Sequence, residues 1–161
     1  IYHLAHRHSL RRLFGSVSAG NLMRIGIEPL HLDMMLDQAA ASMARQGLKS
    51  LPVIDSNGRV AGMLTETDFL RRLKADTFME LLLRLVADID GFSHCCHETP
   101  VSVAMTASLV TIGEQAGFFQ ILRAFHQHEG RSMPVVDTDG HLHGLLLRKD
   151  FIKSFHLEGL L

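Results

Sequence analysis

The stretch LPVIDSNGRVAGMLTETDFLRRL, residues 51–73, decides the fold because the chain contains it twice. Residues 133–155 read MPVVDTDGHLHGLLLRKDFIKSF and align with the first stretch without a gap, at an offset of 82 residues (133 against 51). Eight of the 23 aligned positions are identical. They are Pro52/Pro134, Val53/Val135, Asp55/Asp137, Gly58/Gly140, Gly62/Gly144, Leu64/Leu146, Asp68/Asp150 and Phe69/Phe151. Such self-similarity predicts two copies of one structural unit.

Each copy contains a predicted β-hairpin. Two β-rich runs, 50–54 and 59–64, flank the sequence Asp-Ser-Asn-Gly, a turn composition that favours antiparallel pairing. The sequence Asp-Thr-Asp-Gly at 137–140 repeats this turn in the second copy.

Helices are predicted on both sides of each hairpin. In the first copy, a candidate cap at Asp33 and the terminator Gly47 enclose apolar residues at helical spacing, namely Leu36, Ala39, Ala40 and Met43. The offset of 82 places Phe118, Leu122 and Phe125 on the same face in the second copy. The second helix is marked by Phe69, Leu70 and Leu73 in one copy and by Phe151, Ile152 and Phe155 in the other.

Short extended segments at 28–32 and 109–112 complete a β-α-β-β-α unit in each half. A unit of about 50 residues buries too little surface to be secure alone, so the two copies should pack together. We therefore predict an α+β fold of two repeats packed as a pseudo-two-fold pair.

Composition limits the classes of function. The chain has 161 residues, 47% hydrophobic and 20% charged, which supports a core and argues against intrinsic disorder. A net charge of -1 gives no basic surplus for nucleic-acid binding. No apolar run approaches the length of a membrane span, so no membrane insertion of this chain is expected. The adjacent pair Cys95 and Cys96 indicates a reducing, cytoplasmic setting.

The order of motifs resembles the CBS domain, here as the tandem pair also called a Bateman module. A methionine, a strand and helix, x-P-V-x-D, a turn glycine and G-h-h-T-x-x-D before a helix carry the resemblance. It divides the chain into a basic lead-in (1–21), a first repeat (22–73), a helical linker (74–102) and a second repeat (103–161). The lead-in starts without methionine and is basic, which fits either the cytoplasmic part of a larger, membrane-attached protein or a processed or truncated start with a solvated basic helix.

The resemblance implies a regulatory module and not an enzyme. Tandem pairs of this family commonly bind AMP, ADP, ATP or S-adenosylmethionine in clefts between the repeats, with no obligatory cofactor. They report binding to an attached enzyme or membrane transporter domain and often form homodimers. In agreement, the sequence contains no nucleophile elbow, Walker loop or H-E-x-x-H motif. The alternative is a dimerisation scaffold that needs no ligand.

The resemblance also implies ligand-binding positions. The Asp68 carboxylate would accept hydrogen bonds from the ribose hydroxyls. The Thr65 and Thr67 hydroxyls would donate hydrogen bonds to a phosphate at the helix N-terminus. Thr65 and Asp68 equally fit a capping box that needs no ligand. In the second copy only Asp150 is kept, because Leu147 and Lys149 replace the two threonines.

Cations and an apolar slot complete the predicted site. Lys49, Arg131 and Lys149 lie where relatives meet phosphates, although single basic residues are usually solvated. The adenine slot would be formed by Leu51, Pro52, Met133 and Pro134, which are equally readable as core strand.

Two further features stand outside the repeats' shared pattern. The linker carries an apolar helical stripe, formed by Phe78, Leu81, Leu82, Leu85, Val86 and Ile89, that would cover the core or a second subunit. Histidines and cysteines gather at 94–97, and His141 and His143 share one face of a strand. A metal-responsive protein is one hypothesis for these residues. The spacing at 94–97 does not suit a tetrahedral ion, and we expect both groups to be surface residues without a metal.

Overall fold

Both halves of the chain fold as the predicted β-α-β-β-α unit. The computed structural model describes residues 17–73, 83, 97–107, 109–128 and 130–157. The first repeat comprises β1 (Leu30–His31), α3 (Leu36–Gln46), β2 (Ser50–Ile54), β3 (Val60–Thr65) and α4 (Glu66–Leu73). The second comprises β4 (Ile112–Gly113), α8 (Phe118–Gln127), β5 (Ser132–Val136), β6 (Leu142–Leu147) and α9 (Arg148–Leu157). The single-turn helices α2 (Ala19–Leu22) and α7 (Val101–Ala104) precede the repeats. The mixed α+β class is confirmed.

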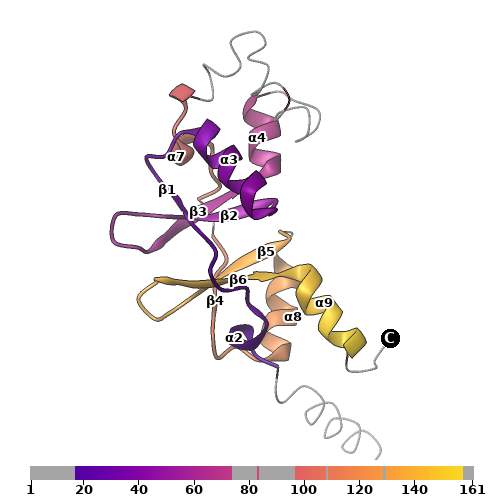
Figure 1. The fold of residues 1–161 in the computed structure, drawn as a ribbon. Helices are drawn as coiled ribbons and strands as arrows, with labels where there is room; N and C mark the ends of the chain where they lie inside the picture. The colour runs from indigo at the N-terminus through magenta and orange to yellow at the C-terminus, as the bar shows by residue number, and fades with distance from the viewer. Residues whose placement is uncertain (1–16, 74–82, 84–96, 108, 129, 158–161) are drawn as a thin grey trace, which may run out of the picture. The chain divides into compact units, whose positions relative to one another are not determined.

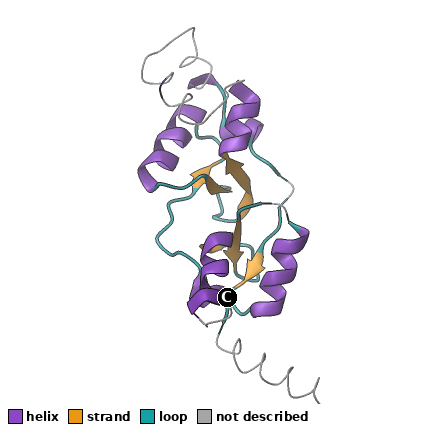
Figure 2. Cartoon of the chain, turned by 90° about the vertical axis from the view of Figure 1, so that its right-hand side faces the viewer, coloured by secondary structure: helices purple, strands orange, loops and turns teal. Residues whose placement is uncertain are grey.

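Each repeat contains one three-stranded sheet with the same topology. The short first strand runs parallel to the middle strand, and the hairpin is antiparallel, giving the orders β1-β2-β3 and β4-β5-β6. Two longer helices lie beside each sheet, α3 with α4 and α8 with α9 (Figure 1). Figure 2 shows the same association of helices and strands in the perpendicular view.

Aspartate and glycine set the hairpin turns. The Asp55 carboxylate accepts the backbone N–H groups of Asn57 and Arg59 at 2.8 and 3.1 Å, and Gly58 has a φ of 81°. Gly140 has a φ of 89° in the corresponding turn. Glycine adopts this left-handed backbone with the least strain, which explains its place in both turns. The antiparallel pairs β2–β3 and β5–β6 confirm the predicted hairpins.

The first long helix of each repeat differs in detail from the prediction. Helix α3 ends at Gly47, with a φ of 65°, as predicted, but Met35 is its N-cap and Asp33 is not. The Met34 N–H donates to the His31 carbonyl at 3.1 Å, so a turn before the helix contains Asp33. On α8 the buried stripe contains Ile121, whereas Leu122 is 43% exposed.

Aromatic rings explain the narrower stripe of α8. Phe118 and Phe125 both lie against Phe151 of α9, with ring centroids 5.3 and 5.8 Å apart. These large side chains fill the core face of the helix that the small Ala39 and Ala40 occupy in α3. Leu122 is consequently left at the edge of this core.

The segment before the first strand of each repeat belongs to the compact unit of the other repeat. The first-repeat unit is Ile27–Leu109, and the second-repeat unit combines Ile1–Gly26 with Val110–Leu161. In the first-repeat unit, Thr106 pairs with Met63 of β3 through two backbone hydrogen bonds of 2.9 and 3.0 Å. In the second-repeat unit, Arg24 pairs with Leu145 of β6 at 2.9 and 3.0 Å.

The 82-residue offset extends to the hydrogen bonds of the single-turn helices. Val101 and Ser102 of α7 donate their N–H groups to the carbonyls of Met34 and Leu32. Ala19 and Gly20 of α2 donate to the carbonyls of Ala116 and Glu114, which occupy the same positions in the second copy. Val101 and Ala19 are fully buried. Each single-turn helix therefore closes the core of the unit in which it lies.

Most of the predicted linker lies outside the described residues. Residues 74–82 and 84–96, which hold the apolar stripe and Cys95 and Cys96, are not described, and the linker helix stays a prediction. Among the described residues, no helix combines the length and apolar character needed to cross a bilayer.

Close approach of the single-turn segments explains two glycines of the repeat. A Cβ atom on Gly144 would lie 2.6 Å from Met23 Sδ and 2.8 Å from the Arg24 carbonyl oxygen. A Cβ atom on Gly62 would lie 2.6 Å from the Thr106 carbonyl oxygen. The pairing of Arg24 and Thr106 with the strands requires glycine at both positions.

We predict that Gly144→Ala lowers the free energy of unfolding by about 1–3 kcal/mol, because the backbone contact must open to admit the methyl group. Gly113→Ala is the matched control, since a Cβ atom there would meet nothing within 4 Å. Urea denaturation of both variants measures the difference. Equal stability of the two variants would contradict the proposed close packing.

Candidate functional site

Asp68, in the first turn of α4, is the best enclosed of the predicted ligand-binding polar residues. Its side chain is 3% exposed. The carboxylate accepts the Thr65 N–H at 2.9 Å through Oδ2 and the Thr106 hydroxyl at 3.2 Å through Oδ1. The Arg71 guanidinium lies 3.7 Å from Oδ1. The protein itself thus supplies donors to both carboxylate oxygens.

Thr65 and Asp68 form the capping box that the sequence left open as an alternative. The Asp68 N–H donates to Thr65 Oγ1 at 3.2 Å, and the Asp68 carboxylate accepts the Thr65 N–H. These reciprocal bonds satisfy two amides at the start of α4. The carboxylate has a structural role in addition to any contact with a ligand.

Asp150, its counterpart in the second repeat, has a different partner. Leu147 replaces the capping threonine, and the Asp150 carboxylate receives Arg24 Nε at 2.9 Å and Arg24 NH2 at 3.3 Å. Such a fork-to-fork ion pair is among the stronger polar contacts in proteins. The pair is accessible, with 40% of the Arg24 side chain and 24% of the Asp150 side chain exposed.

Sequence reasoning missed Arg24 and Thr106, two residues that contact the aspartates of the candidate site. They stand 82 residues apart, and each contacts the aspartate of the unit in which it lies. Met23 and Met105 also stand 82 residues apart, directly before Arg24 and Thr106. This match between the two copies was the sequence signal that could have drawn attention to the pair. The two residues differ in type, so residue identity did not reveal them.

The predicted cations are exposed. Lys49, Arg131 and Lys149 all have exposed side chains, as does Thr67. The backbone carbonyls of Lys49 and Arg131 accept the N–H groups of Glu66 and Arg148 at 2.9 and 2.8 Å. The backbone of each of these two residues is thereby joined to the first turn of the helix that follows the hairpin.

The residues proposed for an adenine slot are core residues in the strands. Leu51, Pro52, Met133 and Pro134 are buried in β2 and β5. The structure brings Lys49, Thr65, Thr67 and Asp68 together in the first-repeat unit. Arg131, Lys149 and Asp150 lie in the second-repeat unit.

A second polar cluster lies at the turn of the second hairpin. His143 Nδ1 is hydrogen-bonded to Glu114 Oε1, and His143 Nε2 lies 3.4 Å from Asp137 Oδ2. Glu114, Asp137 and His143 line a cavity of about 620 Å³ that belongs entirely to the second-repeat unit. His141 Nδ1 also lies 3.4 Å from Asp137 Oδ2. His141 and His143 therefore have a common neighbour, which is consistent with the prediction that they share one face.

Hydrogen bonds and charges shift two pKa values in this cluster. The bond to Glu114 is the main cause that raises the pKa of His143 above its ordinary 6.5, while partial burial opposes the shift. The His141 backbone N–H is the main cause that lowers the pKa of Asp137 below its ordinary 3.8. The Asp139 N–H and the two imidazoles act in the same direction on Asp137. Both shifts favour the charged forms, the imidazolium of His143 and the carboxylate of Asp137.

Comparison with known proteins agrees with this architecture. The family model of the CBS domain matches residues 19–75 and 101–157. The CBS domain of a membrane protein from Sphaerobacter thermophilus superposes with a TM-score of 0.75 at 26% identity, covering 94% of this chain and 96% of that one. CBSX2 from Arabidopsis thaliana, solved in complex with AMP, has a TM-score of 0.68 at 23% identity and covers 88% and 98% of the two chains.

Curated relatives include larger proteins. Inosine-5'-monophosphate dehydrogenase of Mycobacterium leprae is 30% identical over 122 residues, which is 76% of this chain and 19% of that enzyme. The chain spans 19–40% of the length of the first curated relatives that it matches. Two β-α-β-β-α repeats, each with an aspartate at the start of its last helix, define a tandem repeat module. This chain belongs to the CBS-domain family.

We predict that Asp68→Ala lowers the free energy of unfolding by about 1–3 kcal/mol even without ligand, because the Thr65 N–H and the Thr106 hydroxyl lose their acceptor. Asp33→Ala, at an exposed acid of the same unit, is the control. Thermal and urea unfolding measure both variants. A loss no larger than that of the control would show that the capping box contributes little.

We predict that His143 titrates above pH 6.5 in chelator-treated protein and that Glu114→Gln lowers its pKa. The raised pKa means that the contribution of His143 to folding is fully present below pH 6.5 and is lost as the pH rises through the folded-state pKa. NMR titration of the imidazole protons measures the shift, with the exposed His126 as an internal reference. A His143 pKa unchanged by Glu114→Gln would contradict the assigned cause.

Proposed function

We propose that this chain is a regulatory module that binds an adenosine-containing ligand of the AMP, ADP or ATP class and transmits this binding to an attached or partner protein. The observation that carries the proposal is the start of α4, where the exposed Thr67 stands beside the enclosed Asp68. The complex of CBSX2 with AMP, a protein of the same fold, supports this choice of ligand.

The first turn of α4 offers suitable chemistry for a nucleotide. An ionised carboxylate has about four acceptor positions, and the Thr65 N–H and Thr106 hydroxyl use two at Asp68. Ribose hydroxyls would bond to the remaining positions. The Thr67 hydroxyl and the positive end of the helix dipole would face a phosphate, with Lys49 as a nearby cation.

Access to Asp68 requires a small rearrangement. Because Asp68 is 3% exposed, a ribose reaches it only if a neighbour moves. Arg71 is the neighbour best able to do so, since its side chain is 73% exposed and lies 3.7 Å from the carboxylate. A displaced Arg71 would remain available to pair with a phosphate.

Transmission to a partner would use the segment around Thr106. This residue contacts Asp68 through its side chain and β3 through its backbone. A ligand that competes for Asp68 would change the free energy of this contact, and only such a difference between states shifts a conformational equilibrium. The match to a dehydrogenase of which the chain spans 19% is consistent with an attached enzyme as the recipient.

The remaining assignments follow from the same proposal. We expect a non-enzymatic, cytoplasmic module, and Arg131, Lys149 and Asp150 stay predicted contributors to ligand binding. The alternative of a dimerisation scaffold is favoured by exposed apolar side chains on α8 and α9. Phe119 is 54% exposed, and Leu122 and Ile152 are each 43% exposed.

We predict that one of AMP, ADP, ATP and S-adenosylmethionine raises the unfolding temperature of the purified chain. A ligand at 100 times its dissociation constant stabilises the native state by about 2.7 kcal/mol. Thr67→Ala should abolish the shift without changing the stability of the free protein, because Thr67 is exposed. Ser56→Ala, at an exposed hydroxyl of the same unit, should leave the shift intact.

Single alanine variants of Lys49, Arg131 and Lys149 then test which cations meet the phosphate. A thermal shift that persists in Thr67→Ala would place the site elsewhere. No shift with any of the four ligands would overturn the sensing function. A dimer that is weakened by Phe119→Lys would then support the scaffold.

A further inference from the structure

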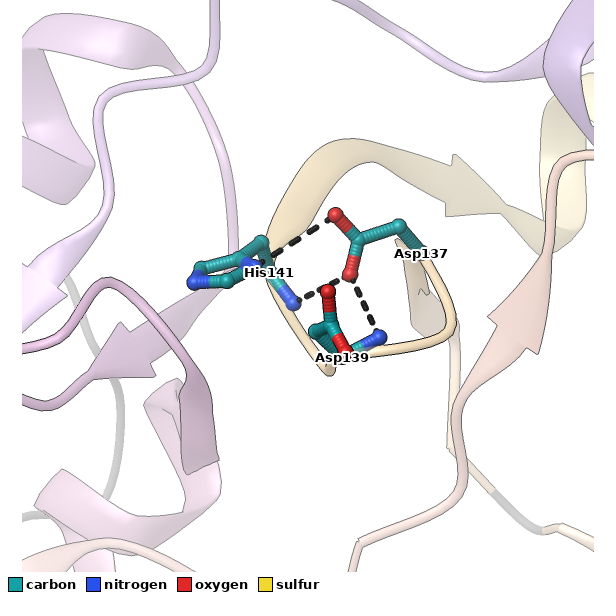
Figure 3. A group of neighbouring side chains, drawn as sticks. All are labelled: Asp137, Asp139 and His141. Carbon is teal, nitrogen blue, oxygen red and sulfur yellow. Dashed lines mark hydrogen bonds and ion pairs between the residues drawn. The ribbon is translucent and has the colours of Figure 1, made fainter.

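The turn of the second hairpin gathers metal-ligating side chains. Asp137, Asp139 and His141 each place one ligand atom within 4.8 Å of the others (Figure 3). His143, two residues further along the chain and within β6, adds a second imidazole to the same turn. Two carboxylates and two imidazoles are thus present within seven consecutive residues.

The two oxygens of Asp137 have separate tasks. Oδ1 accepts the backbone N–H groups of Asp139 and His141, both at 2.9 Å, and so builds the turn. Oδ2 faces the two imidazoles, with His141 Nδ1 and His143 Nε2 both 3.4 Å away. Hydrogen bonds between nitrogen and oxygen are shorter, at about 2.7–3.2 Å. In a tetrahedral site with bonds of about 2.1 Å, ligand atoms lie about 3.4 Å apart. Each imidazole nitrogen therefore lies at the distance from Asp137 Oδ2 that separates two ligands of one ion.

Glu114 supplies an independent indication. Its carboxylate holds Nδ1 of His143, which leaves Nε2 directed at Asp137 Oδ2. Metal-binding histidines usually donate their second ring N–H to a carboxylate in this way, which fixes the tautomer and the ring orientation. Glu114 comes from the segment after β4, so this contact depends on the tertiary fold and not on the hairpin alone.

The first repeat shows that the hairpin does not need this cluster. Asp55 builds the same turn, but Asn57, Arg59 and Ala61 stand where the second repeat has Asp139, His141 and His143. Leu32 stands in place of Glu114. The acids and imidazoles are therefore additions to a turn that already forms without them.

We propose that Asp137, Asp139 and His141, whose ligand atoms lie within 4.8 Å of one another, bind one divalent transition-metal ion of the Zn²⁺ type. Glu114 orients His143 toward Asp137, and His143 or a water molecule completes the coordination. Two imidazoles favour such an ion over Mg²⁺ or Ca²⁺, which prefer oxygen ligands. An ion can reach the site from solvent, because Asp139 is exposed and 33% of Asp137, 42% of His141 and 39% of His143 is accessible. The adjoining cavity of about 620 Å³ leaves room for an exchangeable ligand on the ion. This site revises the expectation that the two histidines are surface residues without a metal.

The test is calorimetric titration of the full chain, freed of metal with a chelator, using ZnCl₂. We expect saturable binding of a single equivalent that is lost in His141→Ala/His143→Ala. Glu114→Gln should weaken binding about 10- to 100-fold while retaining the stoichiometry. Co²⁺ substitution should give the visible absorption of a nitrogen- and oxygen-ligated ion. The control is His126→Ala, at an exposed histidine of α8 outside the cluster.

A second variant separates this site from the cysteines. Cys95→Ser/Cys96→Ser should leave the single equivalent unchanged, and Co²⁺ spectra should lack a thiolate charge-transfer band. Absence of saturable Zn²⁺ binding in the folded chain would overturn the proposal. Loss of binding in the cysteine variant, or unchanged binding in His141→Ala/His143→Ala, would overturn it as well. Circular dichroism of each metal-free variant shows that it is folded.

Discussion

Both units depend on backbone pairing between the segment before the first strand of one repeat and the hairpin of the other repeat. Thr106 pairs with Met63, and Arg24 pairs with Leu145, at the outer strands of the two sheets. An outer strand otherwise presents unpaired N–H and C=O groups, and these segments supply local partners. The single-turn helices on the same segments bury Val101 and Ala19 in the cores. Each compact unit therefore includes a segment that is not continuous in sequence with the strands of its repeat.

The same pairing decides the surroundings of the two corresponding aspartates. The residue that pairs with the strand also directs its side chain to the helix start, so Thr106 bonds to Asp68 and Arg24 bonds to Asp150. The Thr106 hydroxyl brings no charge to Asp68, whereas the Arg24 guanidinium places a positive charge against both oxygens of Asp150. The difference between Thr106 and Arg24, at equivalent backbone positions, thus gives the two aspartates different electrostatic surroundings.

The two repeats are specialised at different positions. The first has the threonines at the start of α4, and the second has the acids and imidazoles at its hairpin turn. Asp137 shows how an added role can coexist with folding, because one oxygen builds the turn and the other faces His141 and His143. A duplicated unit can keep its structural hydrogen bonds in both copies while the remaining lone pairs acquire separate chemistry.

The sequence by itself determined the repeat, the hairpins and the order of elements, because turn residues and apolar periodicity act over a few neighbours. Gly47, Gly58 and Gly140 were predictable since each satisfies a local backbone requirement. The burial of Ile121 in preference to Leu122 was decided by packing against Phe151. Only the tertiary structure placed Arg24 and Thr106 on the aspartates and Glu114 on His143. These contacts join residues 29–126 positions apart, and neither periodicity nor local turn chemistry acts over such separations.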